Sequence, residues 1–232
     1  MSTLYFIRHG QASFGKENYD ALSPLGARQS YALGNFLASR GIAFDALYTG
    51  TLARHIETAD SIMRAYGEHA IPLPEASRME ELNEYDSHSI LKGIVPELLE
   101  KGEVDPSDVA RIFSDRKAFQ RVFEKTMLAW VKGDCRASLT SWQAFVVNVH
   151  HALDAIMQRD GKGKTVAIIT SGGPISAAIR QALLLSDDIT MRVTWQIKNA
   201  SFSKFKCTTE SLMLESFNEV PHLESADLIT YR

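Results

Sequence analysis

The chain has 232 residues, of which 45% are hydrophobic and 23% charged, the balance of an ordinary globular protein and not of a disordered one. Its 25 basic and 28 acidic side chains leave a net charge of −3, so its bulk charge provides no basic face for nucleic acid. The two cysteines, Cys135 and Cys207, are too few and too scattered for a disulfide framework or a zinc site.

The hydropathy, charge and length of the chain predict its location, its classes of partner and its number of domains. No apolar run approaches the roughly 18–20 residues that a membrane span needs, and the first residues do not form a signal peptide. We therefore expect a cytoplasmic protein with neither a membrane nor a nucleic-acid partner. No linker or internal repeat marks a boundary, which favours one domain over residues 1–232.

The N-terminal third alternates short apolar runs with amphipathic stretches. The predicted elements are a strand at 4–7, a helix from Ser23-Pro24 to Gly41, a strand at 44–48, a helix at 52–67 and an edge strand at 71–73. Alternation of strand and helix at this spacing predicts an α/β fold, with a mostly parallel sheet covered by helices on both faces.

The remainder of the chain begins with a helical block at about 87–161, which we interpret as an insertion beside the sheet. Its expected helices lie at 91–101, after Asp105-Pro106, at 116–132, and from a capping box at Thr140-x-x-Gln143 to about 159. Residues 164–170 predict a central strand. The last expected elements are a helix at 175–185 with Pro174 at its first position, and strands at 194–196, 201–207 and 211–217.

Two strand-to-helix junctions carry residues suited to phosphate chemistry. At the first, Arg8 offers a fork for phosphate oxygens, His9 a nucleophile, and Gly10 a close approach for a ligand. At the second, Ser171-Gly172 precedes a helix N-terminus, where unpaired N–H groups bind anions. Because open α/β sheets bind ligands beyond the carboxyl ends of their strands, both junctions are candidate walls of one pocket. A structural histidine and an ordinary glycine turn are the alternatives.

Other charged residues allow further hypotheses. Arg54 lies in a first helical turn, where a cation opposes the helix dipole and faces either an anion or solvent. A run of carboxylates forms either a solvated loop or a general acid whose pKa is raised by like charges, and it comprises Glu80, Glu81, Glu84 and Asp86. His150-His151 with Asp154 is not a metal signature, so we expect no metal.

In chain order, several motifs together resemble the histidine phosphatase superfamily, the phosphoglycerate mutase-like proteins. They are Arg8-His9-Gly10-Gln11, Asp20-x-Leu22-Ser23-x-x-Gly26-x-x-Gln29, Leu52-x-Arg54-x-x-x-Thr58-Ala59, Leu82-Asn83-Glu84 and Asn199-Ala200-Ser201. The matches cover roughly residues 4–205. The resemblance implies a three-layer α/β/α sandwich with a helical insertion.

The resemblance also implies roles for single residues. His9 would become phosphohistidine, Arg8 and Arg54 would bracket the phosphoryl oxygens, and Glu84 would be the proton donor. The implied phosphate-binding set is Arg8, Arg54, Gly10, Gln11, Ser171 and Gly172. The implied ligand is a small phosphorylated molecule or inorganic phosphate, without metal or organic cofactor; the oligomeric state stays unknown.

Three positions depart from the family pattern. Ser171 stands where the family has a second histidine, Gly15 lies near where many members have an asparagine, and His55 stands where a small residue is usual. A neutral hydroxyl in place of an imidazolium would lower the rate by roughly one to two orders of magnitude. We therefore expect Ser171→His to raise phosphatase activity or phosphate affinity.

Our leading hypothesis is a phosphomonoesterase that hydrolyses a small phosphorylated metabolite through phosphohistidine. Ser171 motivates an alternative, a non-catalytic or weakly active protein of the same fold that binds a phosphate ligand or a partner. A phosphoglycerate mutase-type phosphotransferase is the third hypothesis, which no residue specifically favours.

Overall fold

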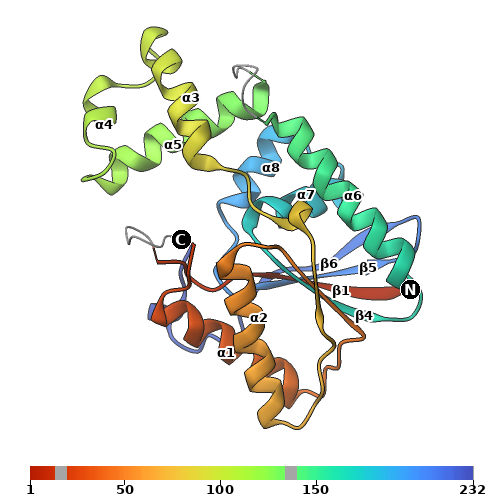
Figure 1. The fold of residues 1–232 in the computed structure, drawn as a ribbon. Helices are drawn as coiled ribbons and strands as arrows, with labels where there is room; N and C mark the ends of the chain where they lie inside the picture. The colour runs from red at the N-terminus through yellow and green to blue at the C-terminus, as the bar shows by residue number, and fades with distance from the viewer. Residues whose placement is uncertain (14–19, 134–139, 232) are drawn as a thin grey trace.

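A six-stranded sheet forms the centre of the computed structural model, which describes residues 1–13, 20–133 and 140–231 (Figure 1). Its strands are β1 (Ser2–Arg8), β2 (Ala46–Thr49), β3 (Ala76–Arg78), β4 (Thr165–Thr170), β5 (Phe202–Cys207) and β6 (Leu212–Glu219). Their order is β3-β2-β4-β1-β5-β6, with the first four parallel and the last two antiparallel to their neighbours. The expected α/β fold with a mostly parallel sheet is confirmed, and β4 is a central strand. Gly15 and Cys135 lie outside the described residues.

Helices cover both faces of this sheet (Figure 1). They are α1 (Pro24–Ser39), α2 (Ala53–Glu68), α3 (Ser87–Glu100), α4 (Pro106–Ala110), α5 (Arg116–Lys132), α6 (Trp142–Asp160), α7 (Gly172–Leu183) and α8 (Asp187–Thr194). Short 3₁₀ turns lie at Glu80–Leu82 and Ala226–Leu228. Helices α1 and α2 lie on one face, and α6 and α7 lie on the other, as the three-layer prediction requires.

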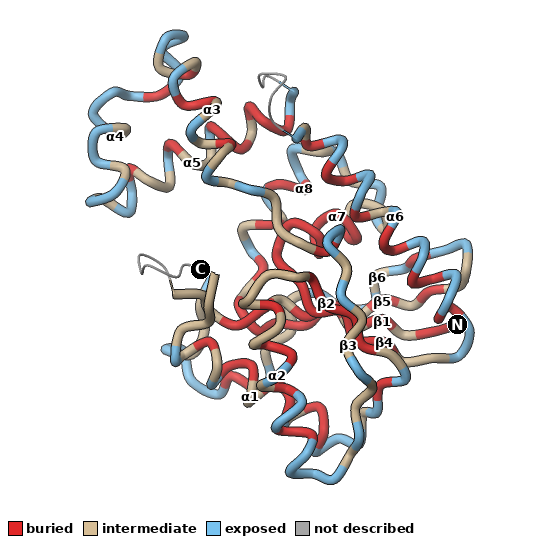
Figure 2. The backbone as a smooth tube through the Cα atoms, in the orientation of Figure 1, coloured by how far each residue is buried: buried red, intermediate tan, exposed pale blue. Residues whose placement is uncertain are grey.

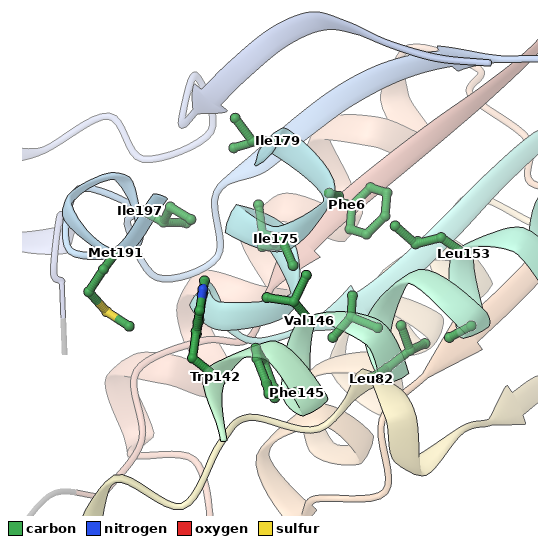
Figure 3. Packing of buried hydrophobic residues seen from close by; sticks show 14 of the residues in the cluster. Phe6, Leu82, Trp142, Phe145, Val146, Leu153, Ile175, Ile179, Met191 and Ile197 are labelled. Carbon is green, nitrogen blue, oxygen red and sulfur yellow. The ribbon is translucent and has the colours of Figure 1, made fainter. Parts of the chain in front are cut away.

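Strand β4 explains why both layers form. Its side chains alternate between two apolar cores, with Val166 and Ile168 in one and Ala167 and Ile169 in the other, and all four are buried. A strand with both faces covered has this continuous apolar sequence instead of an apolar–polar alternation. Figure 3 shows the larger core, where Phe6 of β1 and Leu153 of α6 belong to one packed cluster.

The segment expected to form a helical insertion, about 87–161, meets two different surroundings. Helices α3, α4 and α5 extend away from the sheet, and α4 is largely exposed (Figure 2). Helix α6 instead packs on the sheet beside α7. Trp130 of α5 and Trp142 of α6 join the two parts through an edge-to-face contact with ring centroids 5.4 Å apart.

Two expected strands differ from the structure around β2 and β3. Residues 71–73 are not a strand, because Pro72 and Pro74 have no N–H to donate to a ladder. The chain instead pairs with β2 three residues later, where Leu47 faces Ala76. Strand β2 also begins at Ala46 and not at residue 44.

Several expected helix starts are also corrected. The capping box at Thr140 and Gln143 does not form, because Ser141 caps α6 by accepting from the Ala144 N–H at 3.1 Å. Helix α7 begins at Gly172, so Pro174 is its third residue and not its first.

Two further corrections concern the start of α3 and the end of α8. Helix α3 begins at Ser87, four residues before the expected start, because Asp86 accepts from the Ser89 N–H at 3.1 Å. The strand expected at 194–196 is wrong, since Thr194 ends α8. No helix within the described ranges has both the length and the apolar character needed to cross a bilayer.

Candidate active site

The site lies at the carboxyl edge of the sheet, where β1 and β4 end side by side. Arg8 pairs with Thr170 in the parallel register, and the His9 N–H donates to the Thr170 carbonyl at 2.9 Å. His9 and Ser171, which follow these strands, are therefore neighbours. The two junctions predicted to form one pocket meet at this edge.

His9 is held as a neutral imidazole with one free ring nitrogen. Its side chain is buried, and Nδ1 lies 2.6 Å from the Gly10 carbonyl oxygen. A carbonyl can only accept, so Nδ1 carries the proton and Nε2 keeps its lone pair. Burial, and then the charges of Arg54 and Arg8, hold the pKa of His9 well below its usual value. These are the properties of a nitrogen nucleophile.

A late segment of the chain supports the backbone of His9. The Ala200 N–H and the Asn199 side-chain amide donate to the His9 carbonyl at 3.1 and 3.4 Å. The Arg8 N–H donates to the Ser201 carbonyl at 3.0 Å. The motif at residues 199–201 therefore positions the nucleophile through main-chain contacts.

The positive charges of two guanidinium groups, Arg8 and Arg54, affect the pKa values of both His9 and Glu84. Arg8 donates through Nη1 to the Ile197 carbonyl. Arg54, with its side chain 12% exposed, lies with Nη1 2.5 Å from Oδ1 of Asp20. Asp20 also accepts from the Ala53 N–H at 2.7 Å, so one carboxylate caps α2 and orients Arg54.

Glu84 faces the N-terminus of α7. Both of its carboxyl oxygens lie 3.1 Å from the Gly173 nitrogen, so the group at this helix N-terminus is a side chain of the protein. Burial raises the pKa of Glu84, although the Gly173 N–H and the charges of Arg54 and Arg8 oppose the shift. The cause is therefore burial and not like charges on neighbouring carboxylates, which was one of the two alternatives for this run: Asp86 caps α3, and Glu80 and Glu81 are exposed, as the alternative of a solvated loop predicts for them.

Gly10 and Gln11 have their hydrogen bonds inside the protein. The Gly10 N–H donates to Thr58 Oγ1 at 3.1 Å, and the Gln11 N–H donates to Gln29 Oε1 at 2.9 Å. The Gln11 side chain accepts from Ser23 Oγ at 2.8 Å. These two residues support the junction, and phosphate binding by them stays a prediction.

Ser171 and His55 form a contact that the sequence did not suggest. Both are fully buried, and Ser171 Oγ lies 2.7 Å from His55 Nε2. The His55 and His9 rings lie with centroids 5.6 Å apart. Gly172, predicted to bind phosphate, is the first residue of α7. Within the described residues, no group of three or more His, Cys, Asp or Glu is arranged to hold a metal ion.

A family model decides which proteins this chain is related to. The model of the histidine phosphatase superfamily (branch 1) matches residues 4–101 and 113–220. The chain belongs to this superfamily. The resemblance drawn from the motifs is confirmed.

Solved structures show that the superfamily fold extends over nearly the whole chain. Bacillus stearothermophilus YhfR aligns with a TM-score of 0.65 and 18% identity, over 97% of this chain and 100% of that one. A phosphoserine phosphatase mutant from Entamoeba histolytica, solved with phosphoserine, aligns with a TM-score of 0.63 and 19% identity, over 96% and 100%. At these identities the likeness establishes the fold alone.

Curated relatives in the superfamily match a shorter segment. A 2,3-bisphosphoglycerate-dependent phosphoglycerate mutase from Thermobifida fusca (strain YX) is 34% identical over 87 residues, which is 35% of each chain. A mutase of the same name from Parabacteroides distasonis is 28% identical over the same length. The match thus spans about a third of these relatives.

A cavity of about 390 Å³ adjoins the superfamily site at Glu84. Its charged lining residues are all acidic, and half of its polar lining is uncharged. The acidic residues are Glu80, Glu81, Glu84 and Asp86, and the uncharged polar ones are Asn83, Ser89, Thr140 and Asn148. Its apolar wall includes the aromatic rings of Tyr85, Trp130 and Phe145. The described residues that line it include no lysine or arginine. Glu84 thus lies both at the N-terminus of α7 and on the wall of an acidic, partly aromatic hollow.

The structure brings four of the predicted site residues together and adds two contacts that the sequence did not indicate. Arg8, His9, Arg54 and Glu84 converge, because both arginine charges act on the other two groups. Asp20 was part of a matched motif but had no role, although it contacts Arg54. The role of His55 was missed too: the sequence marked it as unusual without indicating its contact.

Proposed function

We propose that this chain is a phosphomonoesterase that hydrolyses a small phosphorylated metabolite through a phosphohistidine intermediate. The observation that carries the proposal is the state of His9: a buried imidazole that donates from Nδ1 to Gly10 and keeps Nε2 unprotonated near two guanidinium groups. The cytoplasmic location expected from the sequence belongs to the same proposal.

In the first half of the reaction, Nε2 of His9 attacks phosphorus and the bond from phosphorus to the alcohol oxygen breaks. Glu84 in its protonated form, which burial favours by raising the pKa of the carboxyl group, gives its proton to the departing oxygen. Arg8 and Arg54 stabilise the charge on the phosphoryl oxygens, since charge-assisted bonds are the strong ones.

In the second half, Glu84 is a carboxylate and takes a proton from water as the water oxygen attacks phosphorus. The bond between phosphorus and His9 Nε2 breaks, which releases inorganic phosphate and restores the starting protonation states. Glu84 therefore changes from acid to base within one turnover.

The cavity next to Glu84 indicates which alcohol leaves. A general acid must lie within hydrogen-bond reach of the leaving oxygen, so the alcohol lies on the Glu84 side of the phosphoryl group. The acidic wall repels a further carboxylate or phosphate, and the aromatic wall favours an apolar or cationic group. We therefore propose a monoester of a neutral or cationic alcohol, which disfavours the mutase reaction on phosphoglycerate.

The test of this proposal is a phosphatase assay on purified protein with p-nitrophenyl phosphate, comparing wild type with His9→Ala. Wild type should turn over, and His9→Ala should lose at least about a hundredfold in kcat. The matched control is His69→Ala, which removes an exposed imidazole at the end of α2. Rapid-quench labelling should trap an acid-labile phosphoenzyme in wild type and none in His9→Ala. Equal rates in wild type and His9→Ala would refute the role of His9.

A phosphate-binding protein without turnover is the second candidate. The Arg54–Asp20 ion pair favours it, because a carboxylate already occupies one edge of a guanidinium meant for phosphate. Calorimetry with inorganic phosphate that shows binding, together with no hydrolysis of any phosphoester tested, would support this candidate over the enzyme.

A further inference from the structure

Two departures from the superfamily pattern lie in contact. Ser171 is small where the family has a histidine, and His55 is large where the family has a small residue. They are 116 residues apart in the chain, yet Ser171 Oγ and His55 Nε2 lie at hydrogen-bond distance, 2.7 Å. The family has an imidazole directly after β4. This chain has a serine there, and the imidazole of His55 in the first turn of α2 contacts that serine.

The surroundings of His55 decide which ring nitrogen carries the proton. Its Nδ1 is buried and has no hydrogen-bond partner among the described residues. A Cβ at Gly50 would lie 2.2 Å from Nδ1, so the glycine backbone closes this side of the ring. Burial, and then the charge of Arg54, lower the pKa of His55 to about 3, which keeps the ring neutral. A neutral ring has one N–H. On Nδ1 this N–H would stay buried against Gly50 without an acceptor, whereas on Nε2 it donates to Ser171 and leaves the hydroxyl hydrogen for a bound phosphoryl oxygen, so we place the proton on Nε2.

This tautomer decides the direction of the hydrogen bond. Nε2–H donates, and Ser171 Oγ accepts. A hydroxyl that accepts still has its own hydrogen, and within the described part of the chain no acceptor takes it. Ser171 follows β4 directly, next to His9, so that hydrogen lies at the edge of the sheet where the phosphoryl group would bind. Because Ser171 is fully buried in this structure, a phosphoryl oxygen reaches it by displacing the groups that cover it.

We propose that His55 and Ser171 work as a pair in the place of the superfamily's second histidine. Ser171 donates its hydroxyl hydrogen to a phosphoryl oxygen, and His55 is the positioning residue that fixes the hydroxyl by donating to it. This inference rests on the proposed function, since it assigns the contact to the same phosphoryl group that His9 attacks.

The pair changes the expectation for Ser171→His. Because Ser171 is fully buried and already touches an imidazole, a second ring has no space there. The single substitution should lower activity. His55→Ala combined with Ser171→His removes one ring and supplies the other, so it should recover activity relative to His55→Ala alone.

The test is a double-mutant cycle on the full chain with His55→Ala, Ser171→Ala and both together. The readouts are kcat and KM with p-nitrophenyl phosphate and the inhibition constant of inorganic phosphate. Each single variant should lose about tenfold or more in kcat/KM and weaken phosphate binding. The double variant should lose no more than the worse single one, because the two residues supply one contact. His55→Gln, whose amide N–H can reach the same oxygen, should retain most of the activity.

A second measurement separates positioning from a general loss of structure. ¹⁵N imidazole spectra, with the His55 signal assigned by its absence in His55→Gln, should show the proton on Nε2. Single losses that multiply in the double variant, wild-type kinetics in His55→Ala, or a proton on Nδ1 would each overturn the pair. If wild type hydrolyses no phosphoester, the proposed function fails. The pair is then tested by the affinity for inorganic phosphate in the same variants, which each single substitution should weaken and the double variant should weaken no further. If wild type binds no phosphate either, both fail.

Discussion

The pKa values of Glu84 and His9 are shifted in opposite directions, and the two shifts together determine how the activity should depend on pH. Burial raises the pKa of Glu84, whereas burial and two arginines lower the pKa of His9. The nucleophile must be unprotonated and the acid must be protonated. The rate should therefore fall with decreasing pH through the lowered pKa of His9, and with increasing pH through the raised pKa of Glu84.

The leaving group makes this prediction specific to Glu84. For an alkyl phosphate, whose alkoxide needs a proton, Glu84→Gln should lower kcat about a hundredfold and remove the alkaline limb of the profile. For p-nitrophenyl phosphate, whose phenolate leaves without a proton, the loss in the rate of phosphoenzyme formation should be much smaller. A pH–rate series of phosphoenzyme formation, measured by rapid quench on both substrates, checks this, because the role of Glu84 as base in the second step is common to both; an equal loss in the first step would show that Glu84 is not the acid.

At the scale of single residues, the sequence indicated the residues that lie in local motifs and did not indicate the contacts between residues far apart in the chain. Arg8, His9, Arg54 and Glu84 lie in short motifs whose chemistry can be recognised locally. The Arg54–Asp20 ion pair joins residues 34 apart, and the His55–Ser171 bond joins residues 116 apart. No local pattern encodes such contacts, because they exist only once Asp20, helix α2 and the residue that follows β4 have packed together.

At the scale of elements, the first turn of α7 is built around the acid. A Cβ on Gly173 would lie 2.1 Å from Glu84 Oε1, whereas a Cβ on Gly172 would first meet Thr194 Cγ2 at 3.2 Å. Gly173→Ala should therefore displace the carboxylate and lower kcat on an alkyl phosphate about a hundredfold, since misplacement by about 1 Å costs that much.

Gly172→Ala is the matched variant for this prediction, with the same change one residue earlier and a clearly smaller expected loss. Both alanines improve helix propensity, so neither should destabilise α7 through its backbone. Steady-state kinetics and thermal unfolding of the two variants check this. Equal kinetics in the two variants would mean that Glu84 does not depend on the space at Gly173.

Two predicted elements, α5 and the edge strand near residue 71, show when an apolar pattern predicts an element correctly and when it does not. The prediction of α5 at 116–132 matched the structure because an apolar stripe at helical spacing needs no distant partner to be recognised. Around residues 71–78, apolar character favoured the wrong segment. Ile71 and Leu73 pack beside the core of α1 and α2, while the ladder forms at Ala76–Arg78 after the prolines.

At the scale of the whole molecule, the helical block closes one side of the site. Tyr85 packs edge-to-face on Phe145 of α6 and lies 4.9 Å, centroid to centroid, from Trp130 of α5, which places an aromatic wall next to Glu84. The exposed Glu80 and Glu81 add negative charge to the cavity mouth. In the proposed function, the layered sheet holds the residues that act on the phosphoryl group, and the helical block forms the surface that would contact the alcohol.

This arrangement predicts selectivity by charge. Monoesters of neutral or cationic alcohols should have a kcat/KM at least about tenfold above that of 3-phosphoglycerate, whose carboxylate would face the acidic wall. Replacing Glu80 and Glu81 together by glutamine should narrow this ratio at low ionic strength, and added salt should reduce the effect. Kinetics on matched substrate pairs check it, and a preference for 3-phosphoglycerate would contradict it.

The sequence by itself predicted the layered α/β class and the central strand, and it indicated Arg8, His9, Arg54 and Glu84 as the candidate site residues. Each of these depends on a signal carried within about twenty consecutive residues: periodicity, a helix cap or a motif. Tertiary structure alone decided that Asp20 caps α2 and holds Arg54, that burial raises the pKa of Glu84, and that His55 reaches Ser171. These follow from packing, because burial and contact between distant residues are properties of the folded chain and have no local counterpart.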